Sequence, residues 1–151
     1  AFVCHSASAS FTHCIFSRCV FAAIYSKDSA HVSLAHSSLL NSEVGLRIKH
    51  TSFALNNSQI RACTSNGIAL HGTVKGVIEN ANITRCSGSA ILLSPASEVL
   101  ITSSSIRNNG QYGIYAPSGA DFVCTGTEFA DNGVSDYSRP PPLHTSITTK
   151  Q

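Results

Sequence analysis

The sequence predicts an all-β solenoid, in which the 151-residue chain winds through about five to six coils of 22–23 residues. Two observations carry this prediction. A small residue followed by an aliphatic one recurs in steps of 22, 22, 23 and 23 residues, and apolar residues within each coil are spaced by two. A fixed period of this length is typical of stacked-coil architectures. The five pairs are Ala23-Ile24, Gly45-Leu46, Gly67-Ile68, Ala90-Ile91 and Gly113-Ile114.

More apolar residues recur in register with these pairs. One column of apolar residues lies seven residues before the pairs. The second coil departs from this spacing, because Ser38 takes the aligned place and Leu39 stands beside it, as if one residue were lost from a turn. Two further columns lie earlier in each coil, and a last one follows the pairs. The four columns are Phe16, Leu39, Ile60, Ile83, Ile106 and Phe129; Leu34, Leu55, Ile78, Ile101 and Cys124; Val32, Phe53, Gly76 (the exception), Val99 and Phe122; and Leu70, Leu93 and Ala116.

The spacing by two identifies the elements as strands. Phe53 and Leu55, or Ile68 and Leu70, would point to one face of a strand. Strands of about three to five residues are not stable alone, but stacked coils pair each strand with its equivalent about 4.8 Å away. The columns therefore predict a parallel β-helix around one narrow core. The alternative is an antiparallel β-sandwich, which rarely keeps so regular a period.

One more column, three residues after the Phe16 column, holds small or amide side chains. Asparagine at an inner turn can form hydrogen bonds along its own column and tolerates the turn geometry. We therefore expect a stacked turn at this place in each coil. Its members are predicted to be Cys19, Asn41, Cys63, Cys86, Asn109 and Asn132.

The combined pattern, N-x-I-x-x-N-x-x-x-G-I-x-L, resembles the right-handed parallel β-helix repeat family. Three stretches carry the resemblance: IRACTSNGIAL (60–70), ITRCSGSAILL (83–93) and IRNNGQYGIYA (106–116). Right-handed winding also follows from the preferred crossover between parallel strands. The resemblance implies no single function, because the family includes polysaccharide lyases and hydrolases, epimerases, F-box-type substrate receptors and structural solenoids.

Composition divides the chain into three parts. Residues 1–10 are rich in Ser and Ala and lie outside the register, so we expect an irregular segment or a distorted first coil. Residues 11–136 form the predicted β-helix. Residues 137–151 have no period, and their three consecutive prolines cannot donate ladder hydrogen bonds, which predicts a Pro-rich extended tail. Because residues 1–10 offer no helix or charged strand as a cap, we expect further coils or a partner to cover that end of the solenoid.

The charge balance disfavours several classes of partner. Charged residues make up 12% of the chain and the net charge is +2. The basic residues are spread, and Arg61 and Arg107 share a column with Thr84 between them, so we expect no nucleic-acid partner. No apolar run reaches about 18 residues, so we expect no membrane span. The sequence contains no P-loop, dinucleotide-binding or G-x-S-x-G motif.

The acidic residues give only a weak candidate catalytic site. Glu98 and Asp121 are predicted to share one column on adjacent coils, with Lys75 next in that column. Two close carboxylates and a base can perform acid–base chemistry on a polysaccharide. The same column is also what a solvated ladder of charges beside a turn produces, and this is the favoured interpretation. We therefore assign no catalytic residue.

The cysteines and histidines favour a structural interpretation. Three of the six cysteines fall in the turn column and Cys124 in an apolar column, as small buried hydrophobic residues do. We expect free thiols and a reducing, intracellular compartment. No spacing among the Cys and His residues matches a zinc site, so we expect no metal or cofactor. His50 and His71 are expected to neighbour each other on adjacent coils.

These observations favour a non-catalytic function. We expect a β-helical scaffold or protein-interaction segment of a larger intracellular assembly, cytoplasmic or cytoskeletal, with partner proteins at the solenoid ends or on the sheet faces. The sequence favours a protein that is not an enzyme, but an enzymatic function stays open. The alternative is a carbohydrate-active β-helix protein: a polysaccharide lyase, hydrolase or epimerase. The scattered acids count against this alternative.

Overall fold

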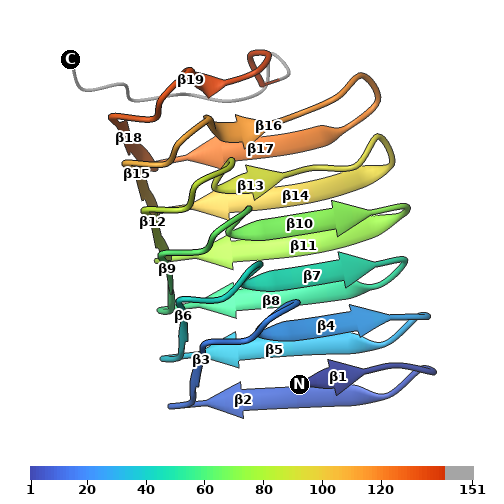
Figure 1. Cartoon of the computed structure of the whole chain (residues 1–151). Coiled ribbons are helices and arrows are strands. Elements are labelled where there is room, and N and C mark those ends of the chain that lie inside the picture. Colours follow the sequence, from blue (N-terminus) through green and yellow to red (C-terminus); the bar gives the residue numbers. More distant parts are fainter. Residues whose placement is uncertain (142–151) are drawn as a thin grey trace.

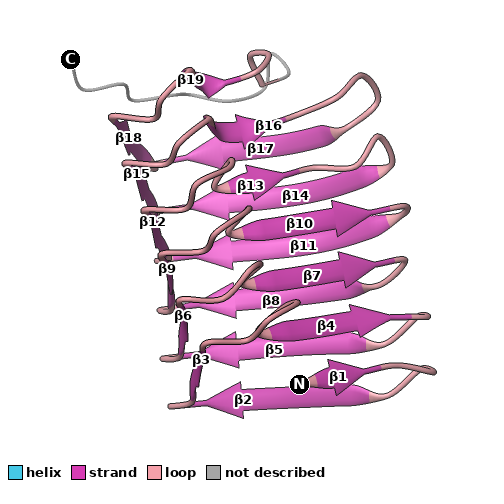
Figure 2. Cartoon of the chain, viewed as in Figure 1, coloured by secondary structure: helices cyan, strands magenta, loops and turns pink. Residues whose placement is uncertain are grey.

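The computed structural model describes residues 1–141, and these residues form strands and turns only (Figures 1 and 2). The strands belong to three parallel sheets, here named A, B and C. Sheet A contains β1 (Phe2–Val3), β4 (Ile24–Lys27), β7 (Leu46–Lys49), β10 (Ile68–His71), β13 (Ile91–Leu92), β16 (Tyr112–Tyr115) and β19 (Ser135–Tyr137). Sheet B contains β2 (Ser8–Thr12), β5 (His31–Ala35), β8 (Ser52–Asn56), β11 (Val74–Glu79), β14 (Ser97–Thr102) and β17 (Asp121–Thr125). Sheet C contains β3 (Ile15–Ser17), β6 (Ser38–Leu40), β9 (Gln59–Arg61), β12 (Asn82–Thr84), β15 (Ser105–Arg107) and β18 (Glu128–Ala130).

Each coil visits sheets A, B and C in turn before the chain steps to the next coil (Figure 1). The strands of each sheet pair in parallel with their equivalents one coil away; β8, for example, lies between β5 and β11. The described residues thus form about six turns of a solenoid, which confirms the predicted all-β parallel fold. The β-sandwich alternative was wrong, because its strands would pair antiparallel.

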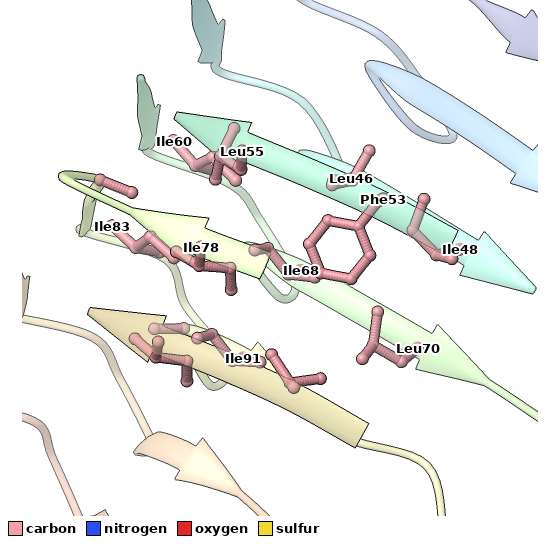
Figure 3. Close-up of a cluster of buried hydrophobic side chains, with 14 of the residues drawn as sticks. Leu46, Ile48, Phe53, Leu55, Ile60, Ile68, Leu70, Ile78, Ile83 and Ile91 are labelled. Atoms are coloured by element: carbon pink, nitrogen blue, oxygen red, sulfur yellow. The ribbon is translucent and has the colours of Figure 1, made fainter. Parts of the chain in front are cut away.

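The predicted apolar columns are the core ladders of the solenoid. Leu46 pairs with Ile24 on one side and Ile68 on the other. Leu39 pairs with Phe16 and Ile60, so the residue lost from the second coil was correctly placed. Most members of these columns are fully buried. Figure 3 shows side chains of neighbouring coils filling one core.

Gly76 leaves a gap in its column that an aromatic ring fills. It lies between Phe53 and Val99, both of which are buried. A Cβ atom at position 76 would collide with the ring of Phe53. The exception noted in the sequence therefore has a packing reason: the missing side chain makes room for the large side chain one coil below.

The two bends on either side of sheet C depend on left-handed residues. Each coil places one residue with φ between +47° and +59° at each bend. Asn, Asp and Gly tolerate this conformation better than most residues, and here they alternate with His, Ser, Arg and Ala. The residues between sheets B and C are His13, His36, Asn57, Asn80, Ser103 and Gly126; those after sheet C are Arg18, Asn41, Ala62, Arg85, Asn108 and Asp131.

The polar turn column contains Ser42, so the prediction of Asn41 in this place was wrong. The backbone N–H of Cys19 donates to Ser42 Oγ at 3.1 Å, whereas Asn41 is an exposed left-handed residue. The cause is the shortened second coil, which aligns Leu39 rather than Ser38 with Ile60 and moves the following column by one residue.

Asn109 forms the densest part of this column, and its replacement by Leu is expected to lower the free energy of unfolding by about 3 kcal/mol. Its buried Oδ1 accepts from Cys86 N at 3.0 Å, and its Nδ2 donates to the carbonyls of Ile83 and Arg107, both at 3.2 Å. Leucine would leave these groups without partners. Urea denaturation checks the result, with exposed Asn82→Leu as control. Equal midpoints for both variants would contradict this role.

The two ends of the described solenoid differ. In the first coil Ile15 and Val20 are 74% and 90% exposed. At the other end, the ring of Tyr137 packs on Phe122 and Phe129 at centroid distances of 6.0 and 4.8 Å. Tyr137 therefore covers part of the last coil. Residues 1–10 contribute β1 and part of β2, and most of the predicted Pro-rich tail, residues 142–151, lies outside the described residues.

Candidate functional site

An exposed column of aliphatic side chains runs over the outer face of sheet B. Burial alternates along β11 and β14, so every second side chain points outward. Val77, Leu100 and Val123 lie in register and are 40%, 41% and 37% exposed. With Ala54 they line a shallow hollow of about 440 Å³. A row of aligned aliphatic residues exposed on a sheet face is a candidate contact surface.

The candidate residues from the sequence border this column. The register places Lys75, Glu98 and Asp121 side by side on β11, β14 and β17, as the sequence predicted. Lys75 Nζ lies 3.1 Å from Glu98 Oε2, and the two side chains are 70% and 63% exposed. A solvated pair of this kind contributes about 1 kcal/mol or less to stability. We call the seven residues Ala54, Val77, Leu100, Val123, Lys75, Glu98 and Asp121 the sheet B patch.

The charged column is exposed to solvent. Carboxyl groups that act as general acids are usually desolvated. Glu98 and Asp121 are instead exposed, and Glu98 is paired with a cation. The geometry matches the solvated ladder of charges that the sequence also allowed.

A signal for the aliphatic column was present in the sequence but was not used. Each strand that carries it has two consecutive apolar residues, such as Val77-Ile78 and Leu100-Ile101. Neighbouring residues of a strand point to opposite faces, so one of each pair must face outward. The inner member was recognised from its column, and the outer member was overlooked.

A second, larger hollow of about 820 Å³ lies on the outer face of sheet C. Arg61 and Arg107 flank Thr84, as the sequence predicted, and Arg85 joins them from the adjacent bend. Arg107 Nη2 is 3.3 Å from Glu128 Oε2. The remaining lining consists mainly of amide and hydroxyl side chains, so this surface is polar.

All six cysteines are free in the structure, and Cys63, Cys86 and Cys124 are buried. A hydrogen bond with Cys63, together with burial, raises the pKa of the Cys86 thiol. Burial likewise raises the pKa of Cys124. Thiols that stay protonated are poor nucleophiles, so Cys86 and Cys124 act as core residues. Cys63 packs in the same buried core.

The histidines neighbour one another without forming a site. The backbone N–H of His50 donates to the carbonyl of His71 at 3.0 Å, so the two residues are neighbours. The strand register pairs His71 with Lys49 rather than with His50. Burial, and then the nearby cations Arg47 and Lys49, lower the pKa of His71. The rings of His13 and His36 form a parallel stack that was not predicted from the sequence, with ring centroids 5.2 Å apart.

Residues 1–141 contain neither a cluster of metal ligands nor a membrane-spanning helix. Within that range, no three His, Cys, Asp or Glu side chains gather closely enough to hold a metal ion. The same residues contain no helix that is long and apolar enough to cross a membrane.

Fold and surface define a small all-β solenoid whose outer faces include an apolar hollow on sheet B and a polar hollow on sheet C. The chain matches the family model described as "Right handed beta helix region" over residues 1–139. It therefore belongs to the right-handed β-helix family, which confirms the resemblance and the handedness predicted from the sequence. No curated protein and no solved structure matches the chain.

Proposed function

We propose that this β-helix is a non-catalytic scaffold or protein-interaction segment, and that the sheet B patch is its contact surface. The observation that carries the proposal is the column of Val77, Leu100 and Val123, which stays 37–41% exposed on a rigid sheet. Burying these side chains against a partner is favourable. Because strands of a solenoid are already ordered, docking costs little conformational entropy.

The surroundings of the column also suit a protein partner. Lys75, Glu98 and Asp121 border one side, and Glu79 and Thr102 border the other. An apolar centre with a polar rim is the usual anatomy of a protein–protein interface. The patch thus combines an apolar centre with charges that orient a partner.

We further propose that the partner assembly is intracellular. The support is chemical: all six cysteines are free thiols, and three of them are only partly buried. Such thiols persist in a reducing compartment and tend to be oxidised outside it. A cytoplasmic or cytoskeletal assembly fits this chemistry.

The alternative function is a carbohydrate-active protein, and Asp121→Asn tests it. We expect the change to leave the fold intact, because Asp121 is exposed and lies outside the core. The free energy of unfolding should change by less than about 0.5 kcal/mol. The wild-type chain should release no fragments from acidic polysaccharides, with or without Ca²⁺. Cleavage that Asp121→Asn abolishes while the fold is kept would establish the alternative.

Leu100→Lys tests the proposed contact surface. The substitution places a charge in the centre of the sheet B patch, while Val134→Lys, at a 60% exposed position outside it, serves as the matched control. Each variant is expressed in the source cells and sized in a gentle extract. Wild type and Val134→Lys should elute in a particle larger than 15.9 kDa, and Leu100→Lys as the free chain. Elution of the wild type as the free chain would contradict the proposal.

A further inference from the structure

We propose that the sheet B patch binds a second copy of this chain, face to face, with the two solenoids running antiparallel. This inference rests on the proposed function and names the partner of the same surface. The order of charges along the patch supports this pairing, because a two-fold interface must be complementary to itself.

The register fixes which residues can face one another. A two-fold axis that runs along the strand direction, midway between β11 and β14, keeps each column opposite itself and reverses the order of the coils. Strand β11 then faces β14 of the second copy, and β8 faces β17. Two sheets packed in this way lie about 10 Å apart with their strands nearly aligned.

This arrangement places unlike charges opposite each other. Lys75 of each copy faces Glu98 of the other, and each is already paired with its own neighbour at 3.1 Å. The four side chains form a square in which charges alternate. Each charged group then has two oppositely charged neighbours, and both electrostatic attractions become stronger as water is excluded from the interface.

The same axis also matches the uncharged columns. Val77 faces Leu100 of the second copy, and Ala54 faces Val123, so the exposed aliphatic side chains cover one another. Asp121 faces the hydroxyl of Ser52. No two like charges oppose each other anywhere on the face.

Other two-fold arrangements are less complementary. An axis centred on β14 brings Glu98 against Glu98, and an axis centred on β11 brings Lys75 against Lys75. An axis parallel to the solenoid places Lys75 opposite Glu79 and leaves Glu98 opposite a threonine. The antiparallel register therefore places more opposite charges in contact than the other two-fold arrangements do.

The size of the face predicts a weak dimer. Four strands of five or six residues cover an area of about 19 by 18 Å. The area of this face is smaller than the roughly 800 Å² that each partner buries in a standard interface. We therefore expect a concentration-dependent equilibrium between monomer and dimer.

Sedimentation velocity of the purified chain, from low to high micromolar concentration, tests the pairing through charge reversal. Lys75→Glu and Glu98→Lys should each weaken dimerisation about tenfold or more, because each places like charges in contact. The double reversal Lys75→Glu/Glu98→Lys restores the square and should return the dissociation constant to within about threefold of wild type. Arg107→Glu breaks the comparable Arg107–Glu128 pair on sheet C and should not affect dimerisation.

Circular dichroism and melting confirm that every variant is folded. A wild-type chain that stays monomeric at the highest concentration would overturn the dimer, as would a double reversal no better than the single ones. If the larger particle in extracts still depends on Leu100 in either case, the proposed function stands and only the identity of the partner is wrong. If the expected dimerisation is not observed and the particle in extracts does not depend on Leu100, both proposals are contradicted.

Discussion

Ile83→Asp is expected to unfold the solenoid. Ile83 lies at the centre of β12, is 0% exposed, and pairs with Ile60 and Ile106 of the adjacent coils. An unpaired carboxylate in this core would cost several kcal/mol or more, against a total stability of about 5–15 kcal/mol for a domain. Far-UV circular dichroism and urea denaturation would show loss of the β signal.

The matched control for Ile83→Asp is Asn82→Asp, one residue earlier in the same strand. Asn82 is exposed and points away from the core. This variant should unfold at a urea concentration close to that of the wild type. A folded Ile83→Asp protein would mean that the column is not buried, and the assignment of the core ladders would be wrong.

Gly76→Val is expected to lower the free energy of unfolding by about 3 kcal/mol. The ring of Phe53 fills the space beside Gly76, and Figure 3 shows it within the core between neighbouring coils. A valine side chain must displace this ring, and a close-packed interior has no room for it. Urea or thermal denaturation measures the loss.

Restoring the space tests this explanation. In the double variant Phe53→Val/Gly76→Val, the valines replace the ring and the gap, so Val32, Val99 and the two new residues form a regular column. The double variant should be more stable than Gly76→Val alone, since residues that share one space are strongly coupled. Additive losses from the two single changes would show that they do not share it.

The core was predictable because stacked strands enforce a strict register. A residue such as Ile60 must align with Leu39 and Ile83, and any error moves a side chain to the other face of the sheet. The shortened second coil was recognised at Leu39 for this reason. The same shift was not carried forward three residues, which is why Asn41 was taken in place of Ser42.

The candidate surface was only half predictable. The order Lys75, Glu98 and Asp121 followed directly from the period of the sequence. The neighbouring aliphatic column was missed because an apolar residue in a strand is normally assigned to the core. The lining of the hollow on sheet C includes Arg85, which reaches it from a left-handed bend that the strand pattern does not describe.

Hydroxyl-radical footprinting tests the central claim most directly, by comparing the chain in its native particle with the isolated chain. We predict that Val77, Leu100 and Val123 are oxidised more slowly in the particle, whereas Val20 and Val134, which are also exposed, are oxidised at the same rate in both. Protection of Val20 or Val134 with unchanged oxidation of the sheet B patch would contradict the account and place the contact surface elsewhere.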